Sequence, residues 1–222
     1  MHTIEEHVLR HLTRYSEATF SQMKPKLIES NVFTYHLKKL ITAGYIKKTK
    51  QIYSLSAKGK QFADTISHEN FTPRIQPKIV TLIVLEYQNK YLLYKRDKEP
   101  FVGYVGFPYG KIHLEERVAE AAKRELIEKT GFETELVHKG DMYITAHSEV
   151  ELISHMLCHI FYKKISKAEY TKSLLKLHST SFWSEIQKNG DTKYIPGVMQ
   201  ILKNLAKHKG KKFFFAEYFL NV

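Results

Sequence analysis

Residues 103–132 read GYVGFPYGKIHLEERVAEAAKRELIEKTGF, and this stretch decides the fold of the larger part of the chain. It opens with a loop rich in glycine and aromatic residues, 103–112, and a helix is predicted to follow from Glu115 to Thr130. Gly131 is a typical C-terminal stop for such a helix. The helix is expected to bury one apolar stripe, made of Val118, Ala121, Ala122, Leu126 and Ile127.

Carboxylates converge at one edge of this helix. Glu125 and Glu128 lie three residues apart, and Glu116 stands on the preceding turn or loop. Hard divalent cations take oxygen ligands, and magnesium held by a few carboxylates commonly bridges substrate phosphates. Taken alone, glutamates on a charged helix are more often a solvated face, so the argument depends on their spacing.

The spacing resembles the Nudix box. The residues that carry the resemblance are Gly110, Glu116, Arg124-Glu125-Leu126, Ile127, Glu128 and Gly131-Phe132, with Phe107-Pro108 as the usual lead-in. The resemblance runs from about Lys78 to His208 and includes a late strand at Phe182-Trp183 and a closing helix from Pro196 to Ala206. It implies an α/β/α sandwich with a mixed sheet.

The resemblance also implies chemistry. In that family the box helix holds magnesium, or manganese, against a diphosphate, and water attacks a phosphorus of a nucleoside diphosphate derivative. Carried over, Glu125 and Glu128 are metal ligands or base, Glu116 is a supporting carboxylate among the metal ligands, and Arg124 orients them. Gly110 is expected to bring its carbonyl close to the metal. We expect ligand contacts from three basic residues, Arg96, Lys111 and Lys129.

Lys129 is the main departure from the family pattern, which has a glutamate there that is usually a principal metal ligand. A lysine one turn after Glu125 is expected to pair with it and to place a positive charge where the ion should lie. Tyr109 and His113 also replace the usual glycine and glutamate. Glu149 or Glu151, on an expected loop before a strand at 152–162, are further acidic candidates that the sequence leaves open.

The first seventy residues have a different pattern. Ile4, Val8, Leu9 and Leu12 predict an amphipathic helix behind Thr3, and a short helix is expected at 21–28, interrupted at Pro25. From Asn31 to Thr42 the apolar positions Phe33, Leu37, Leu40 and Ile41 share one face. The polar residues of this helix are expected to lie outward or to the side: Thr34, Tyr35, His36, Lys38 and Lys39.

Residues 45–55 predict two short strands around a lysine-rich turn, and a helix follows at Ala57–Ile66. With Ala43-Gly44-Tyr45-Ile46 and Tyr53-Ser54-Leu55, residues 1–68 resemble winged-helix regulators of the ArsR and MarR kind. The resemblance implies duplex DNA as partner, though many winged helices bind protein or RNA instead. The expected DNA contacts are Asn31, Thr34, Tyr35, His36 and Lys38 on the helix, and Lys47, Lys48 and Lys50 on the wing.

The predicted organisation is therefore a winged helix-turn-helix at residues 1–72, a linker at 73–77 and a Nudix domain at 78–222, an α/β protein overall. A hairpin of strands at 79–87 and 90–96 is expected to open the second domain. The net charge of +12 favours a polyanionic partner, although lysine is abundant throughout the chain. Cys158 is expected to be a buried structural thiol. Without a membrane span or signal-like start, we expect a cytoplasmic protein.

Three functions remain open from the sequence. The first is a regulator, expected to act as a homodimer, whose degenerate Nudix domain binds a nucleoside-diphosphate ligand with weak or absent hydrolysis. The second is an active magnesium-dependent diphosphohydrolase with an accessory winged helix. The third is a scaffold whose pocket binds nothing specific. One fold hosts catalysts and sensors alike, so the residues of the site must decide between them.

Overall fold

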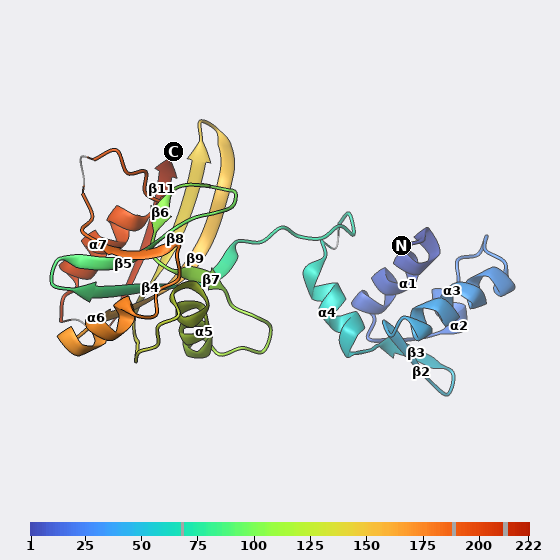
Figure 1. Ribbon diagram of the computed structural model, residues 1–222. Helices are drawn as coiled ribbons and strands as arrows, with labels where there is room; N and C mark the ends of the chain where they lie inside the picture. Colours follow the sequence, from blue (N-terminus) through green and yellow to red (C-terminus); the bar gives the residue numbers. More distant parts are fainter. Residues whose placement is uncertain (68, 188–189, 211–212) are drawn as a thin grey trace. The chain divides into compact units, whose positions relative to one another are not determined.

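The structure, a computed structural model, describes residues 1–67, 69–187, 190–210 and 213–222 (Figure 1). The chain divides into two compact units, Met1–Gln76 and Pro77–Val222. Both units combine helices with strands, so the expected mixed α/β class is confirmed. In the ranges described, no helix is both long enough and apolar enough to cross a membrane.

The first unit packs helices against a small antiparallel sheet, in which the strand order is β1-β3-β2. Its core is formed by the apolar stripe of α1, including Val8 and Leu12, against Phe33 and Leu37 of α3. The expected helical periodicity of both segments is therefore confirmed. The elements are α1 (Thr3–Arg14), β1 (Glu17–Thr19), α2 (Phe20–Met23), α3 (Ser30–Thr42), β2 (Ile46–Thr49), β3 (Ile52–Leu55) and α4 (Ala57–Thr65).

Three details of this unit differ from expectation. The second helix does not extend over 21–28 but ends at Met23, because Pro25 has no N–H to continue it. His2, rather than Thr3, caps α1 and forms a capping box with Glu5. Ile41 was assigned to the buried face of α3 but is 37% exposed.

The segment after α4 was expected to be an extended linker, yet part of it folds back on the first unit. Ile66 bridges Pro73, and the N–H of Arg74 donates to the carbonyl of Thr65. The ring of Phe71 packs against Phe62. His68, between Ile66 and Pro73 in the chain, lies outside the described residues.

The second unit is built on a mixed sheet, as expected. The order of its strands is β10-β5-β4-β9-β8-β11. β4 runs parallel to β9 and β11 runs parallel to β8, while the other pairs are antiparallel. The strands are β4 (Lys78–Tyr87), β5 (Lys90–Lys95), β6 (Val105–Gly106), β7 (Tyr109–Lys111), β8 (Val137–Ser148), β9 (Glu151–Lys164), β10 (Ser181–Ser184) and β11 (Phe214–Asn221).

Helices cover both faces of this sheet. The side chains of β4 alternate, so that Val80, Leu82 and Val84 pack with residues of α7 (Val198–Lys207). Ile83 and Leu85 point the other way and pack with Ala122 and Leu126 of α5 (Val118–Thr130). Because each face carries its own apolar cluster, the arrangement is a sandwich of helix, sheet and helix.

The helix of the decisive stretch begins at Val118 rather than Glu115, because the carboxylate of Glu116 accepts from the N–H of His113 and holds the preceding turn. Ile127, assigned to the buried stripe, is 41% exposed. The closing helix begins at Val198 instead of Pro196. Elements that the sequence pattern did not predict are β1, β8, β11 and α6 (Lys167–Leu174), and also β6 and β7, which lie in the expected loop 103–112.

Candidate functional site

A pocket of about 320 Å³ opens where β4, β7 and α5 meet. A volume of this size lies at the lower end of the range typical of small-molecule sites. The pocket collects most of the residues that the sequence nominated, namely Arg96, Gly110, Lys111, Glu125, Glu128 and Lys129. It also gathers residues that sequence reasoning missed, among them Lys78, Lys98 and Ser154.

Arg124 organises the acidic residues beside this pocket. Its Nε and Nη2 donate to the two carboxylate oxygens of Glu116 at 2.7 and 2.8 Å. Nη1 donates to Glu125 at 2.7 Å and to Glu128 at 3.2 Å. Nη2 also donates to the carbonyl of Lys111 at 3.0 Å, which ties α5 to the end of β7. The side chain therefore orients all three glutamates.

This network shifts the pKa of Glu116 and of Arg124. The hydrogen bonds from Arg124, assisted by the backbone N–H of His113, lower the pKa of Glu116 to about 2. The bonds to Glu116 raise the pKa of the Arg124 guanidinium above its usual value, against the opposing effect of burial. Glu116 thus stays ionised and is bound on both oxygens, so it supports the site through Arg124.

Gly110 makes room for the carboxylate of Glu125. A Cβ on Gly110 would collide with the carboxylate of Glu125, which would have to move away. Glycine at this position therefore lets the carboxylate of Glu125 lie against β7. Glu125 has a side-chain exposure of 7% and Glu128 one of 52%, so the former is packed and the latter reaches toward solvent.

Lys129 does not form the expected ion pair with Glu125. Among the residues that the structure describes, the oxygen Oε1 of Glu125 is paired with Nη1 of Arg124 instead. The side chain of Lys129 lines the pocket together with Glu125 and Glu128. The expectation of a Lys129–Glu125 pair is therefore wrong, and the ammonium group remains available to the pocket.

The donor set fits a magnesium ion that relies on few protein ligands. Glu125 and Glu128 each engage one carboxylate oxygen with Arg124, and among the described residues the other oxygen of each is left for a cation. Magnesium is often bound by one or two carboxylates together with substrate phosphates. Glu149 and Glu151, the further acidic candidates, are not part of the pocket lining, to which β9 contributes Ser154 and Met156.

The first unit presents a separate set of nominated residues. Asn31, Tyr35 and Lys38 are exposed on α3, and Lys47, Lys48 and Lys50 are exposed on and beside β2. Thr34 is half-buried and its hydroxyl donates to the carbonyl of Ser30 at 2.7 Å. These side chains share two adjoining elements of one compact unit (Figure 1).

His36 was expected to lie outward and to contact DNA bases, but the structure contradicts this placement. Its side chain is buried, and Nδ1 lies 3.0 Å from Oε1 of Glu5. The ring of His2 stacks on it at 4.1 Å. His36 follows the exposed Tyr35 on α3, and one step along the helix turns its side chain toward α1. It therefore packs inside the first unit and is not placed to read DNA bases.

Glu5 is a buried carboxylate with several partners. Nζ of Lys39 lies 2.9 Å from its Oε1, and the N–H of His2 donates to Oε2 at 3.2 Å. Burial opposes ionisation, but the hydrogen bonds from Lys39, His36 and His2 outweigh it and lower the pKa of Glu5 to about 2. The cluster joins α1 to α3.

Cys158 is fully buried on β9, and its expected role as a structural thiol agrees with its environment. Burial raises the pKa of this thiol to about 12, so the reactive thiolate is suppressed.

Comparison with known proteins adds to this geometry. The family model of the NUDIX domain matches residues 76–183. An ADP-ribose pyrophosphatase of Methanocaldococcus jannaschii is 32% identical over 85 residues, which cover 36% of this chain and 50% of the relative. The match thus spans half the length of that curated protein.

Solved structures with related coordinates include a mutator MutT protein of Bacillus halodurans, with a TM-score of 0.49, 17% identity and coverage of 65% of this chain and 90% of that chain. Another is the NUDIX domain of Shewanella oneidensis NrtR in complex with ADP-ribose, with a TM-score of 0.48, 16% identity and coverage of 62% and 93%. The family model and the curated relative together support a Nudix domain in the second unit.

Proposed function

We propose that the second unit binds a nucleoside diphosphate derivative and that the first unit binds duplex DNA, so that the chain is a ligand-responsive regulator with weak or absent hydrolysis. The observation that carries the ligand proposal is the charge of the pocket. Its lining combines five basic residues, Lys78, Arg96, Lys98, Lys111 and Lys129, with three acidic ones, Asp97, Glu125 and Glu128.

This mixture suits a diphosphate. The basic residues attract its negative charge, and Glu125 and Glu128 would hold a magnesium ion that would supply further positive charge beside the phosphates. Arg96 is preorganised, because Nε and Nη2 donate to the carbonyls of Pro100 and Glu99 at 2.6 and 3.1 Å. The curated relative is named ADP-ribose pyrophosphatase, which makes ADP-ribose the first ligand to test.

Lys129 supports binding with slow turnover. It contributes a fixed positive charge beside Glu125 and Glu128. An ammonium at this place attracts a phosphate group but repels the cation that would activate water. Because Lys129 stands where the family pattern has a glutamate, the site also offers one carboxylate fewer, and magnesium would be bound more weakly. We therefore expect the pocket to bind its ligand and to hydrolyse it slowly.

The ligand proposal is tested by calorimetry on the full chain with ADP-ribose, a nucleotide sugar and a dinucleoside polyphosphate. We expect all diphosphate compounds to bind more tightly than AMP. Lys111→Ala should weaken ADP-ribose binding about tenfold, since a charge-assisted hydrogen bond contributes about 1.5–3 kcal/mol. Lys90→Ala, an exposed lysine outside the pocket lining, is the matched control. Equal affinity for AMP and ADP-ribose would refute the diphosphate assignment.

The DNA proposal rests on the order of elements and on charge. Helix α3 follows the short helix α2 and precedes the β2–β3 hairpin, which is the arrangement of a winged helix-turn-helix. The exposed polar residues of α3 are suited to contact DNA bases. The lysines of the hairpin are suited to contact phosphates. Fluorescence anisotropy with a labelled duplex should show binding that weakens as salt rises. Binding that does not respond to salt would exclude a phosphate-contacting surface.

A second candidate is an active diphosphohydrolase, and a specific observation favours it. Arg124 holds Glu116, Glu125 and Glu128 together, so the carboxylates of the box are ordered for catalysis. In that case Glu125 or Glu128 would hold magnesium or take a proton from the attacking water. Turnover of ADP-ribose at about 1 per second or faster would select this candidate over the regulator.

A further inference from the structure

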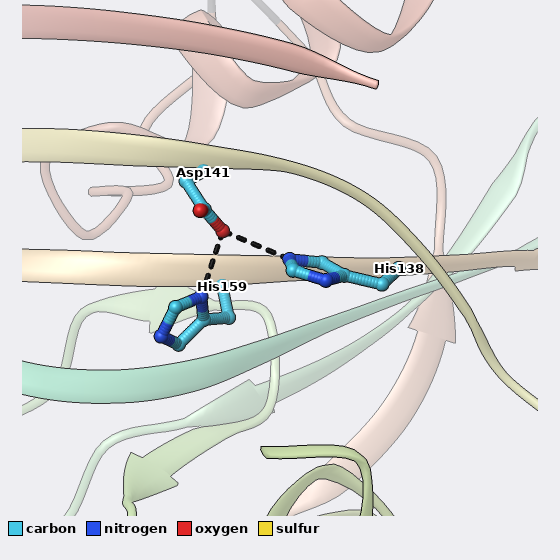
Figure 2. A group of neighbouring side chains, drawn as sticks. All are labelled: His138, Asp141 and His159. Carbon is cyan, nitrogen blue, oxygen red and sulfur yellow. Dashed lines mark hydrogen bonds and ion pairs between the residues drawn. The ribbon is translucent and has the colours of Figure 1, made fainter. Parts of the chain in front are cut away.

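A second cluster of ligating side chains lies on the open part of the sheet in the second unit, on β8 and β9. Figure 2 shows His138, Asp141 and His159 pointing toward one another. Nε2 of His138 lies 2.8 Å from Oδ1 of Asp141, and Nδ1 of His159 lies 2.7 Å from the same oxygen. All three potential ligand atoms are within 4.8 Å of one another.

A bulge in β8 creates this cluster. His138 and Asp141 are three residues apart, so in a regular strand their side chains would lie on opposite faces. The register shifts between His138, which pairs with Phe161, and Gly140, which pairs with Ile160. Asp141 then pairs with His159, so that all three side chains share one face. A bulge that redirects a side chain in this way is a common device beside functional sites.

The packing around the cluster orders its ligands but leaves an approach from solvent. The ring of His138 stacks on Phe161 at 4.9 Å and meets the edge of Phe213 at 5.3 Å. The side chains of His138, Asp141 and His159 are 34%, 23% and 16% exposed. A partly enclosed site of this kind can admit an ion without rebuilding the strands.

We propose that His138, Asp141 and His159 bind a divalent transition-metal ion, with Zn²⁺ as the principal candidate. Two imidazoles and one carboxylate match the ligand set of zinc sites that keep a fourth position for water. Imidazole nitrogen favours Zn²⁺ over Mg²⁺, which prefers oxygen ligands. Metal–ligand distances near 2.0–2.1 Å set donor atoms about 3.3 Å apart, so each imidazole nitrogen needs to move only about 0.5 Å away from the Asp141 oxygen.

On binding, each imidazole turns a nitrogen lone pair toward the metal, and its ring proton resides on the other nitrogen or leaves to solvent. Asp141 contributes a carboxylate oxygen as the third ligand.

The cluster is separate from the pocket beside Glu125. Gly110, Thr81, His159 and Asp141 form one row across β7, β4, β9 and β8. Adjacent strands are about 4.8 Å apart, so the backbone of His159 lies about 10 Å from that of Gly110. None of the three ligating residues lines the pocket. The two sites thus hold different ions by different chemistry.

The test is calorimetric titration of Zn²⁺ into the full chain, freed of metal by a chelator and carrying no polyhistidine tag. We expect one ion per chain with a dissociation constant of about 1 µM or lower, and no competition from millimolar Mg²⁺. Co²⁺ should bind at the same site and give visible absorption bands that Zn²⁺ abolishes.

Variants locate the ion. His138→Gln and His159→Gln should each weaken Zn²⁺ binding at least about tenfold, and Asp141→Asn, which preserves side-chain shape, should do likewise. His155→Gln, a neighbouring half-buried histidine on β9, is the matched control and should leave affinity unchanged. Glu125→Gln should also leave it unchanged. The proposal is overturned if the parent chain binds no Zn²⁺, if the three ligand variants bind as the parent does, or if Glu125→Gln alone removes binding.

Discussion

At the residue scale, Lys129 separates the two candidate functions of the pocket. Lys129→Glu adds a carboxylate beside Glu125 and Glu128 and removes an ammonium that repels the cation. We therefore expect tighter Mg²⁺ or Mn²⁺ binding, by about tenfold or more, and a measurable gain in ADP-ribose hydrolysis. Chromatography of the released products measures the rate of hydrolysis. Glu125→Gln should abolish activity in either background. A Lys129→Glu chain that hydrolyses more slowly than its parent would mean that the lysine itself takes part in turnover.

Glu5 makes the first unit sensitive to acid. Its pKa is about 2 in the folded chain against 4.5 ordinarily, so its stabilisation is complete above pH 4.5 and is lost as the pH falls toward 2. The pKa difference sets a ceiling of about 3 kcal/mol, and solvent screening at the exposed Lys39 reduces it to about 1–2 kcal/mol.

Glu5→Gln should therefore lower the free energy of unfolding of the full chain by that amount at pH 7, and the difference from the parent should shrink toward pH 3. Denaturant titrations at several pH values measure both effects. Glu6→Gln, which loses only the exposed ion pair with Arg10, is the control and should cost well under 1 kcal/mol. A difference between Glu5→Gln and parent that is the same at pH 7 and pH 3 would contradict the assignment.

At the scale of elements, the place of the Glu125 carboxylate between α5 and β7 depends on Gly110. Gly110→Ala places a methyl group on the carboxylate of Glu125, which must then move away from Arg124. We expect a loss of about 1–3 kcal/mol in the free energy of unfolding, as for overpacking in a core. ADP-ribose and Mg²⁺ affinity should fall together. Gly190→Ala, at an exposed glycine without a positive φ where the added carbon meets only the side chain of Gln187, tests for a general effect of losing a glycine. Unchanged ligand affinity in Gly110→Ala would show that the position of Glu125 is unimportant to binding.

The β2–β3 hairpin is the element whose charge should set the salt response of DNA binding. Replacing Lys47, Lys48 and Lys50 by alanine should reduce the slope of log affinity against log salt by up to about 2.7, since each phosphate contact contributes about 0.9. The charge-matched control replaces the exposed Lys167, Lys172 and Lys176 of the second unit. Anisotropy titrations at several salt concentrations measure the slopes. Equal slopes in the two triple variants would show that the hairpin does not contact the DNA phosphates.

At the scale of the whole molecule, the regulator proposal requires the two units, Met1–Gln76 and Pro77–Val222, to be coupled. ADP-ribose should change the affinity of the full chain for a duplex selected from random sequence by about fivefold or more, and the duplex should change ADP-ribose affinity by the same factor. Anisotropy and calorimetry measure the two directions independently. If ADP-ribose binds but both factors stay near one, the units act independently and the accessory-domain alternative is preferred.

The sequence by itself determined the local features of this protein. The apolar periods of α1, α3 and α5 are visible in the chain because a helix that packs on one side repeats its buried positions every three or four residues. The spacing of Gly110, Glu116, Arg124, Glu125 and Glu128 likewise nominated residues that the structure brings to one place, since most of them lie on a single helix and the turn before it.

Tertiary structure alone decided the contacts between distant segments. His36 follows an exposed tyrosine on a basic helix, yet the buried carboxylate of Glu5 draws it inward. Lys129 was expected to pair with Glu125, but Arg124 pairs with Glu125 instead, and Arg124 is itself held by Glu116 and the carbonyl of Lys111 outside the helix. The cluster of His138, Asp141 and His159 has no sequence signature, because it exists only through a bulge in β8 and the pairing register with β9. Periodicity is a property of one segment, whereas partners across strands and helices depend on how segments meet.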